Sequence, residues 1–220
     1  MSWLFNIFKR LFLEYERAPE PTLEIVPFVP FFDSEGWATD SRVVKVPSRK
    51  SWCYSKLSTK SGLPDGITMH FTSTAAGTAM NMAVRRRDHD RKEFEPKPPG
   101  SWHFTAAQNG VIIQQLSLQR GAFHAGSKTA IKLPIGWANF VTCGIELEGF
   151  GDAFSEAQIE SLCWLYRGIV THCGIKRENA MFEHSKIDSG RKTDPGELFM
   201  SRYSQRVLDY AFGSIGPVIA

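Results

Sequence analysis

The stretch VTCGIELEG, residues 141–149, predicts a β-strand whose two faces differ in chemistry. Successive side chains of a strand point to opposite faces, so residues two apart share a face. One face of this strand carries two glutamates, Glu146 and Glu148. The apolar face carries Val141, Cys143, Ile145 and Leu147. We therefore expect a strand that buries one face in a core and presents carboxylates on the other.

Two further regions predict strands. GITMHFT, residues 66–72, alternates in the same way and places His70 on its polar face. SWHFTAA and GVIIQQLS flank the dipeptide Asn109-Gly110, which is a strong hairpin signal between two β-prone runs. His103 lies early in the first of these runs, where packing or support of a site is a more fitting role than direct metal binding.

Helices are expected between and after these strands. Residues 156–173 repeat apolar side chains at helical spacing, with Ser155 and Gln158 as a capping box and Gly174 as the stop. Residues 197–213 predict one final helix. Strands mixed with helices favour an α/β or α+β fold in which helices cover a sheet.

The N-terminal region divides into two segments ahead of the globular domain, which we expect at 36–220. Residues 1–17 place their apolar side chains on one side of a helical wheel. Such an arm binds a membrane surface or a protein partner, or packs on its own domain. Residues 18–35 contain four prolines, which favour an extended linker.

The overall composition narrows the partners and the compartment. A net charge of +3 is too small for a polyelectrolyte binder, so we expect no specific nucleic-acid partner, although RRRDHDRK at 85–92 concentrates cations. No apolar run is long enough to cross a bilayer. No cleavable signal is evident, which predicts synthesis in the cytoplasm. The four cysteines form no CxxC pair, which favours reduced thiols.

The segment EHSKIDSGRKTDPG, residues 183–196, is too rich in glycine for a long helix and too polar for a strand. Glycine and proline set turns that fold such a loop back on itself. His184 and Asp194 at its two ends would then face one ion together with His70. Catalytic zinc takes three such ligands and keeps a fourth position open. We therefore expect Zn²⁺ as the cofactor.

Hydrolysis of an amide at such an ion needs two more groups. One takes a proton from the attacking water, and one stabilises the oxyanion. Glu146 or Glu148 would supply the carboxylate, and Lys192 would supply the positive charge. The spacing alone does not choose between the two glutamates.

Four motifs, taken together and in this order, resemble the type-2 N-acetylmuramoyl-L-alanine amidases. This family includes the AmpD amidases, phage lysozymes and peptidoglycan recognition proteins. The resemblance covers residues 64–212. The motifs are MHFTST at 69–74, AFHAG at 122–126, Asn139 followed by GIELEG at 144–149, and His184 followed by RKTDPG at 191–196.

The resemblance implies a mixed central sheet flanked by helices and zinc held by His70, His184 and Asp194. It assigns the general base to Glu146, the first glutamate of GIELEG, and the polarisation of the scissile carbonyl to Lys192.

The resemblance also implies that His124, Asn139 and Arg191 contact the substrate. Family members with a cysteine ligand often use a tyrosine to assist the water. Trp102 occupies the matching position here, which favours a carboxylate base.

The function expected from the resemblance is zinc-dependent hydrolysis of the bond between N-acetylmuramic acid and L-alanine in peptidoglycan or muropeptides. The N-terminal segments favour a phage-type lytic or wall-directed enzyme, which would act in the host periplasm or cell wall or travel in the virion. One alternative is a cytosolic, AmpD-like enzyme that recycles muropeptides. Another is a non-catalytic module that binds peptidoglycan or inhibits a partner; the retained ligands, carboxylate and lysine favour the enzyme.

Overall fold

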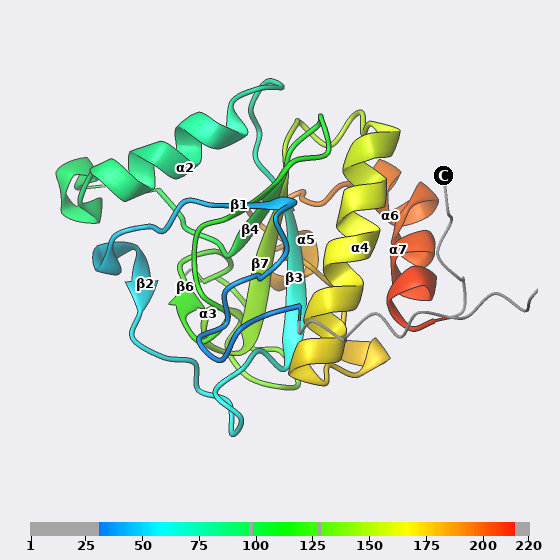
Figure 1. Ribbon diagram of the computed structural model, residues 1–220, viewed down its shortest axis with the longest axis horizontal. Helices are drawn as coiled ribbons and strands as arrows, with labels where there is room; N and C mark the ends of the chain where they lie inside the picture. The colour runs from blue at the N-terminus through cyan, green and yellow to red at the C-terminus, as the bar shows by residue number, and fades with distance from the viewer. Residues whose placement is uncertain (1–30, 97–98, 127–128, 214–220) are drawn as a thin grey trace, which may run out of the picture.

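A computed structural model describes residues 31–96, 99–126 and 129–213 (Figure 1). The expected arm at 1–17 and most of the expected linker lie outside these residues. The described chain forms a six-stranded mixed sheet in the order β1-β5-β4-β7-β3-β8, and a separate pair, β2-β6. The strands are β1 Val43–Lys45, β2 Cys53–Tyr54, β3 Gly66–Phe71, β4 Phe104–Ala106, β5 Ile112–Gln114, β6 Gly121–Ala122, β7 Thr142–Leu147 and β8 Phe182–Glu183.

The α/β class and the mixed central sheet are confirmed. Strand β7 lies in the middle of the sheet, parallel to both β3 and β4. The expected hairpin is also present, because β4 and β5 pair antiparallel. Strands β1 and β8 add parallel edges next to β5 and β3.

Helices cover both faces of this sheet. The long α4, with α6 and α7 beside it, lies on one side, and α2 lies on the opposite side (Figure 1). The helices are α2 Ala79–Asp88, α3 Ala138–Val141, α4 Glu156–Cys173, α5 His184–Ile187, α6 Glu197–Arg202 and α7 Ser204–Ala211, with short 3-10 turns η1 Lys50–Trp52, η2 Arg91–Phe94 and η3 Arg177–Asn179.

The two faces of the sheet belong to different clusters of apolar side chains. Ile112 packs in the main core with α4, whereas the neighbouring Ile113 packs with Ala83 of α2. The same alternation puts Met69 of β3 in the main core and turns His70 to the other face. The apolar face of β3 and β7 therefore anchors the sheet, and their polar face is left for a site.

The long helix α4 confirms its expected start and end, but its capping box is only half formed. Ser155 Oγ accepts a hydrogen bond from the Gln158 amide at 3.0 Å, and Gly174 ends the helix in the left-handed conformation. The Gln158 side chain instead donates to the carbonyls of Ala106 and Glu148. Buried carbonyls at strand ends need hydrogen-bond donors. The Gln158 side chain therefore bonds to the sheet and not, as the sequence had predicted, to the start of the helix.

Two other expectations need correction. The single helix expected over 197–213 is wrong, because the chain breaks at Tyr203, whose φ of −118° departs from the helical value. Residues 31–35, assigned to the linker, include packed side chains. Phe31 stacks on Trp164 with ring centroids 4.4 Å apart, and Phe32 is buried in the main core. Aromatic side chains at the end of the proline segment thus join the domain.

Within the described part of the chain, no helix has the length and apolar character needed to cross a bilayer.

Candidate metal centre

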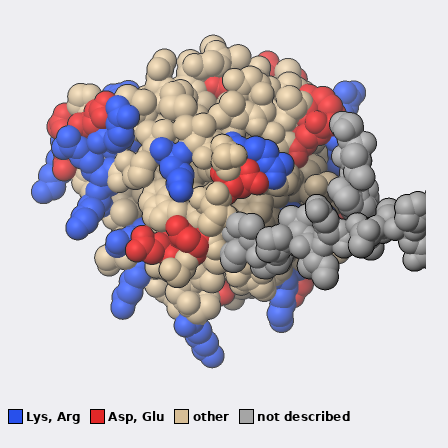
Figure 2. Space-filling model, viewed as in Figure 1, with Lys and Arg blue, Asp and Glu red and all other residues tan. Residues whose placement is uncertain are grey.

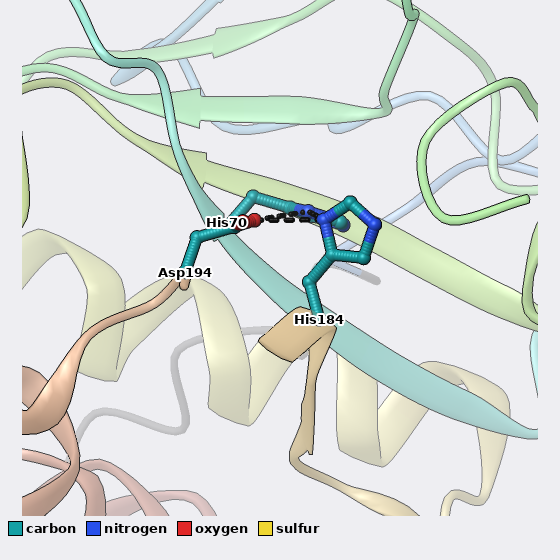
Figure 3. A group of neighbouring side chains, drawn as sticks. All are labelled: His70, His184 and Asp194. Carbon is teal, nitrogen blue, oxygen red and sulfur yellow. Dashed lines mark hydrogen bonds and ion pairs between the residues drawn. The ribbon is translucent and has the colours of Figure 1, made fainter. Parts of the chain in front are cut away.

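Three side chains from distant parts of the chain converge on the polar face of the sheet (Figure 3). His70 lies near the C-terminal end of β3, and His184 opens α5 directly after β8. Strands β3 and β8 are parallel, and Met69 is paired with Glu183. The residues that follow, His70 and His184, therefore lie side by side. Asp194 completes the group from the end of the following loop.

The loop between His184 and Asp194 is closed by backbone hydrogen bonds. Ser185 N donates to the Asp194 carbonyl at 2.8 Å, which ties the two ends together. The amides of Arg191 and Lys192 both donate to the Asp188 carbonyl. One turn of helix, α5, forms in a segment that we expected to be irregular. The loop folds back as the glycines and the proline predicted.

The donor atoms form a nearly equilateral triangle. Nδ1 of His70, Nδ1 of His184 and Oδ2 of Asp194 are separated by 2.9, 2.9 and 2.8 Å. Two imidazole nitrogens and a carboxylate oxygen are the donor set of a catalytic zinc site. Among the described residues, the buried Nε2 of His184 has no partner. These residues fit a zinc ion with three protein ligands.

The protonation of the triangle suits a cation. Burial lowers the pKa of His70 to about 4, which keeps its imidazole neutral at pH 7. Burial raises the pKa of Asp194, but hydrogen bonds from His184 and His70 outweigh it and hold this pKa well below its usual range. A neutral imidazole and an ionised carboxylate are the forms that bind a metal.

Glu146 lies beside the triangle because of strand register. It is the direct partner of His70 across the parallel pair β3 and β7. Burial and the nearby Asp194 raise the pKa of Glu146 to about 8, while Arg86 and Lys192 oppose this rise. Its buried Oε2 has no hydrogen-bond partner among the described residues. Glu146 is therefore a carboxyl whose oxygen is free to act.

Glu148 has both carboxylate oxygens engaged. Oε1 accepts from the Ala79 amide at 2.7 Å, at the start of α2, and Oε2 accepts from the Gln108 amide at 3.0 Å. This side chain therefore joins α2 to the sheet. Spacing alone did not separate the two glutamates, but among the described residues Glu146, unlike Glu148, has a buried carboxylate oxygen without a hydrogen-bond partner.

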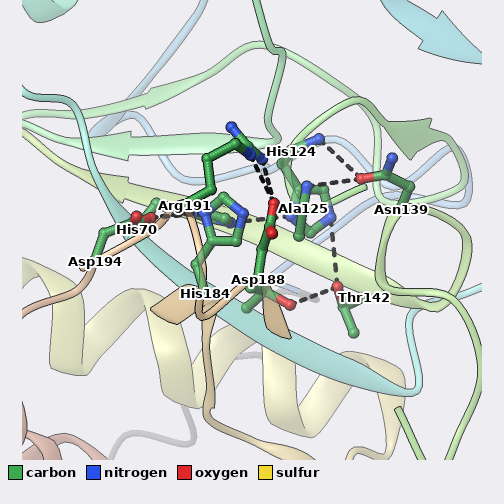
Figure 4. Close-up of polar contacts among 10 residues, drawn as sticks. His70, His124, Ala125, Asn139, Thr142, His184, Asp188, Arg191 and Asp194 are labelled. Carbon is green, nitrogen blue, oxygen red and sulfur yellow. Dashed lines mark hydrogen bonds and ion pairs between the residues drawn. The ribbon is translucent and has the colours of Figure 1, made fainter. Parts of the chain in front are cut away.

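His124 contacts His70 through the other ring nitrogen of His70. His70 Nε2 and His124 Nδ1 are 3.0 Å apart, and His124 Nε2 lies 3.4 Å from Thr142 Oγ1 (Figure 4). Thr142 in turn donates to the Ala138 carbonyl and lies 2.8 Å from Thr68 Oγ1. If His70 binds a metal through Nδ1, its Nε2–H donates to His124, and His124 Nε2–H donates to Thr142. The structure thus ties His124 to His70.

The other residues assigned to substrate contact also have partners in the protein. Asn139 Oδ1 accepts from the amides of His124 and Ala125 at 3.0 and 2.8 Å, so it holds the AFHAG segment in place. Arg191 forms an ion pair with the buried Asp188 at 2.6 Å. Arg191 and Asn139 nevertheless line a small cavity next to the triangle, together with Lys192.

The triangle opens into a cavity of about 400 Å³. Glu146, Lys192 and the three triangle residues line it, together with Trp102. The Trp102 indole N–H donates to Thr105 Oγ1 at 2.7 Å, so this residue forms part of the wall. His103 lies outside the triangle, because its ring bridges the Arg120 carbonyl and the Gly144 amide.

Arg86 is a residue of this cavity that sequence reasoning missed. Charge runs such as 85–92 are usually solvated, and Lys and Arg side chains do gather around α2 at the left of Figure 2. Arg86 is instead buried, donates to the Gly100 carbonyl, and lies 3.8 Å over the ring of Trp102. Ala79, Ala83 and Arg86 lie on one face of α2. Their spacing in the sequence is the signal that could have indicated a buried Arg86.

Comparisons with known proteins found related sequences and structures. The profile of the N-acetylmuramoyl-L-alanine amidase family matches residues 60–197. The 1,6-anhydro-N-acetylmuramyl-L-alanine amidase AmpD of Salmonella typhimurium is 32% identical over 100 residues, which cover 45% of this chain and 52% of AmpD. The match therefore spans about half the length of this curated relative.

Solved structures resemble the fold. A selenomethionine derivative of AmpD superposes with a TM-score of 0.62 and 26% identity, covering 80% of this chain and 98% of the other. The amidase AmiD of E. coli, solved with anhydro-N-acetylmuramic acid-L-Ala-D-gamma-Glu-L-Lys, gives a TM-score of 0.52 at 23% identity. That comparison covers 86% of this chain and 67% of AmiD, and it supports the fold alone.

Proposed function

Because the chain belongs to the N-acetylmuramoyl-L-alanine amidase family, we propose that it hydrolyses the amide between N-acetylmuramic acid and L-alanine. The observation that carries the proposal is the triangle of His70, His184 and Asp194 beside the unpartnered carboxyl of Glu146. All four residues lie within the matched range. We take as substrate a muropeptide of the kind named for AmiD, free or within peptidoglycan.

His70, His184 and Asp194 would hold the zinc ion. A zinc ion supplies Lewis acidity, which lowers the pKa of a water and polarises a carbonyl oxygen. The protein fixes the direction of the ligands through the hydrogen bonds behind them. His124 and Thr142 set the proton on Nε2 of His70 and leave Nδ1 free as a donor atom.

Glu146 acts as the general base and then as the acid. It takes a proton from the attacking water, and the water oxygen forms the new bond to the lactyl carbonyl carbon. When the bond from this carbon to nitrogen breaks, Glu146 returns the proton to the amine of L-alanine. A pKa raised by burial suits a group that must both accept and release a proton near neutral pH.

Lys192 supplies positive charge on the same cavity. Among the described residues it forms no direct ion pair, so its ammonium group is available in the cavity. The carbonyl oxygen gains negative charge as water adds to the carbon, and a fixed cation stabilises that charge. Lys192 therefore has the oxyanion role that the family motif implies.

Two cellular uses fit this chemistry. The proline-rich and amphipathic sequence at 1–35 favours a phage-type or wall-directed enzyme that cuts the polymer. The identity with AmpD favours an enzyme that cuts soluble anhydromuropeptides. A variant without residues 1–30, which keeps Phe31 and Phe32 in the core, separates the two. A wall-directed enzyme loses activity on sacculi and keeps activity on soluble muropeptides.

The direct test compares the wild type with Glu146→Gln and with Glu178→Gln, an exposed glutamate of η3. We expect about one zinc per chain in all three proteins. Glu146→Gln lowers the turnover of a soluble muropeptide by about 10²- to 10⁴-fold, the usual share of a general base. Glu178→Gln cleaves at the wild-type rate.

Zinc analysis and chromatography of the released peptide supply the two readouts. Zinc bound without cleavage of sacculi or muropeptides would instead favour the non-catalytic module. Cleavage that persists in Glu146→Gln with full zinc content would remove Glu146 from the chemistry.

A further inference from the structure

A second cavity adjoins the metal centre and carries an excess of positive charge. It encloses about 270 Å³ and shares Gly100, His124 and Lys192 with the cavity of the triangle. Two arginines, Arg91 and Arg191, line it together with Lys192. Of these three cations, Arg191 is compensated by Asp188. The cavity therefore has two cations for which the described residues provide no ion-pair partner.

Arg91 is held in this cavity by aromatic and backbone contacts. It opens η2, and its amide donates to Ser51 Oγ at 3.1 Å. Its guanidinium lies 4.2 Å over the ring of Phe123, which contacts the ring of Tyr54 at 4.4 Å. The Nε atom is buried and lacks a hydrogen-bond partner in the described structure. A buried guanidinium N–H without an acceptor is costly, and an anion would satisfy it.

The proposed substrate carries such an anion close to the scissile amide. In the muropeptide named for AmiD, glutamate is linked through its γ-carboxyl, so its α-carboxylate is free. It is the first negative charge after the scissile amide, with only L-alanine between. One extended residue spans about 3.5 Å. The two cavities share Gly100, His124 and Lys192, so a peptide whose lactyl carbonyl lies at the triangle can place this carboxylate in the adjoining cavity.

We infer that Arg91, with Lys192 and Arg191 around it, binds the α-carboxylate of the γ-linked glutamate and makes it a determinant of specificity. This inference rests on the proposed function. It assigns a role to the segment between β3 and β4, which the family motifs leave out. Arg91 belongs to the run 85–92. Arg87 of the same run is exposed and forms an ion pair with Asp88.

The test uses two substrates that differ at one group. One is N-acetylmuramyl-L-Ala-D-γ-Glu-L-Lys, and the other carries D-isoglutamine, whose α-carboxylate is replaced by a neutral carboxamide. The full chain with its zinc is compared as wild type, Arg91→Gln, Arg91→Lys and the control Arg87→Gln. The measured quantity is kcat/KM for release of the peptide from each substrate.

We expect the wild type to prefer the carboxylate substrate by about tenfold or more, the size of a charge-assisted hydrogen bond. Arg91→Gln removes this preference by slowing the carboxylate substrate, and its rate on the carboxamide substrate stays within about twofold, which also shows that it is folded. Arg91→Lys keeps part of the preference, and Arg87→Gln keeps all of it.

Equal rates of the wild type on both substrates overturn the inference while the proposed function stands. The same holds if Arg91→Gln slows both substrates equally, because Arg91 would then only support the fold. Cleavage of neither substrate by the wild type overturns the proposed function and the inference together.

Discussion

His124 contacts the ring nitrogen of His70 that faces away from Asp194, and this contact sets the protons of both rings. Thr142 Oγ1 donates to the Ala138 carbonyl, so its two lone pairs are free to accept from His124 and from Thr68. Every donor in this series of hydrogen bonds, from His70 through His124 to Thr142, then has an acceptor. Partners behind a metal ligand commonly change metal affinity 10- to 100-fold when they are lost.

We therefore expect Thr142→Val to weaken zinc binding by about 10- to 100-fold. Valine keeps the volume of threonine but removes the acceptor for His124, which frees the His124 and His70 rings to change tautomer. Thr142→Ser restores the affinity. The zinc dissociation constant is measured by competition with a chromogenic chelator, with Thr171→Val, exposed on α4, as the control. Unchanged zinc affinity in Thr142→Val would contradict the role given to the hydrogen bonds from His70 through His124 to Thr142.

At the scale of the element, the parallel pairing of β3 with β7 and β8 builds the site. Side chains of one strand are fixed relative to those of its neighbour by register, so His70 and Glu146 become adjacent. The helix α4 holds the opposite face of the same strands through the main core. Anything that loosens α4 is therefore expected to weaken the support of the site.

The C-terminal stop of α4 gives an element-scale prediction. Gly174 has φ +66° and would meet no atom if it carried a side chain, so Gly174→Ala tests backbone strain alone. We expect it to lower the free energy of unfolding by about 1 kcal/mol, because an L-residue is disfavoured in the left-handed region. Gly190 also has open space but a φ outside that region, so Gly190→Ala is the matched control.

The two variants are compared by urea denaturation. An equal loss of stability in both would show that the left-handed conformation is not the cause.

At the scale of the whole molecule, folding buries several ionisable groups in one small region. Burial lowers the pKa of His70 and of His103 to about 4, and it holds the pKa of His124 well below its usual value. Burial raises the pKa of Glu146 to about 8. The stability of the metal-free protein must therefore depend on pH.

We expect the metal-free protein to lose stability as the pH falls from about 6.5 to about 4. In this range the unfolded chain binds protons at these histidines and the folded chain does not, so acid favours unfolding. Each histidine contributes up to about 1.4 kcal/mol per pH unit. Glu146 opposes this. Its raised pKa gives stability that is present at about pH 4.5 and is lost as the pH rises to about 8, so acid stabilises the folded protein through this group. Three histidines outweigh one glutamate, and the net slope is positive.

Urea denaturation in the presence of a chelator at pH 7, 6 and 5 measures this slope. A stability that stays constant or increases toward pH 5 would show that the buried histidines are not held neutral.

The sequence by itself determined the family and most of the elements of this protein. Alternation at 66–72 and 141–149 placed His70 and Glu146 on the polar faces of two strands, and helical spacing with Gly174 located α4. Local patterns suffice here because the period of a strand or helix is a property of the backbone. The motifs also contained each residue of the triangle.

Only the tertiary structure decided how these parts are shared. Strand order made His70 and Glu146 neighbours, and it engaged Glu148 at the start of α2, although the two glutamates look alike in sequence. Packing buried Arg86 of the charged run beneath α2 and placed Arg91 over the ring of Phe123, in the cavity beside the triangle. These outcomes depend on contacts between residues that are far apart in the sequence. Most buried polar atoms form hydrogen bonds in such contacts, and the few that do not remain available for chemistry.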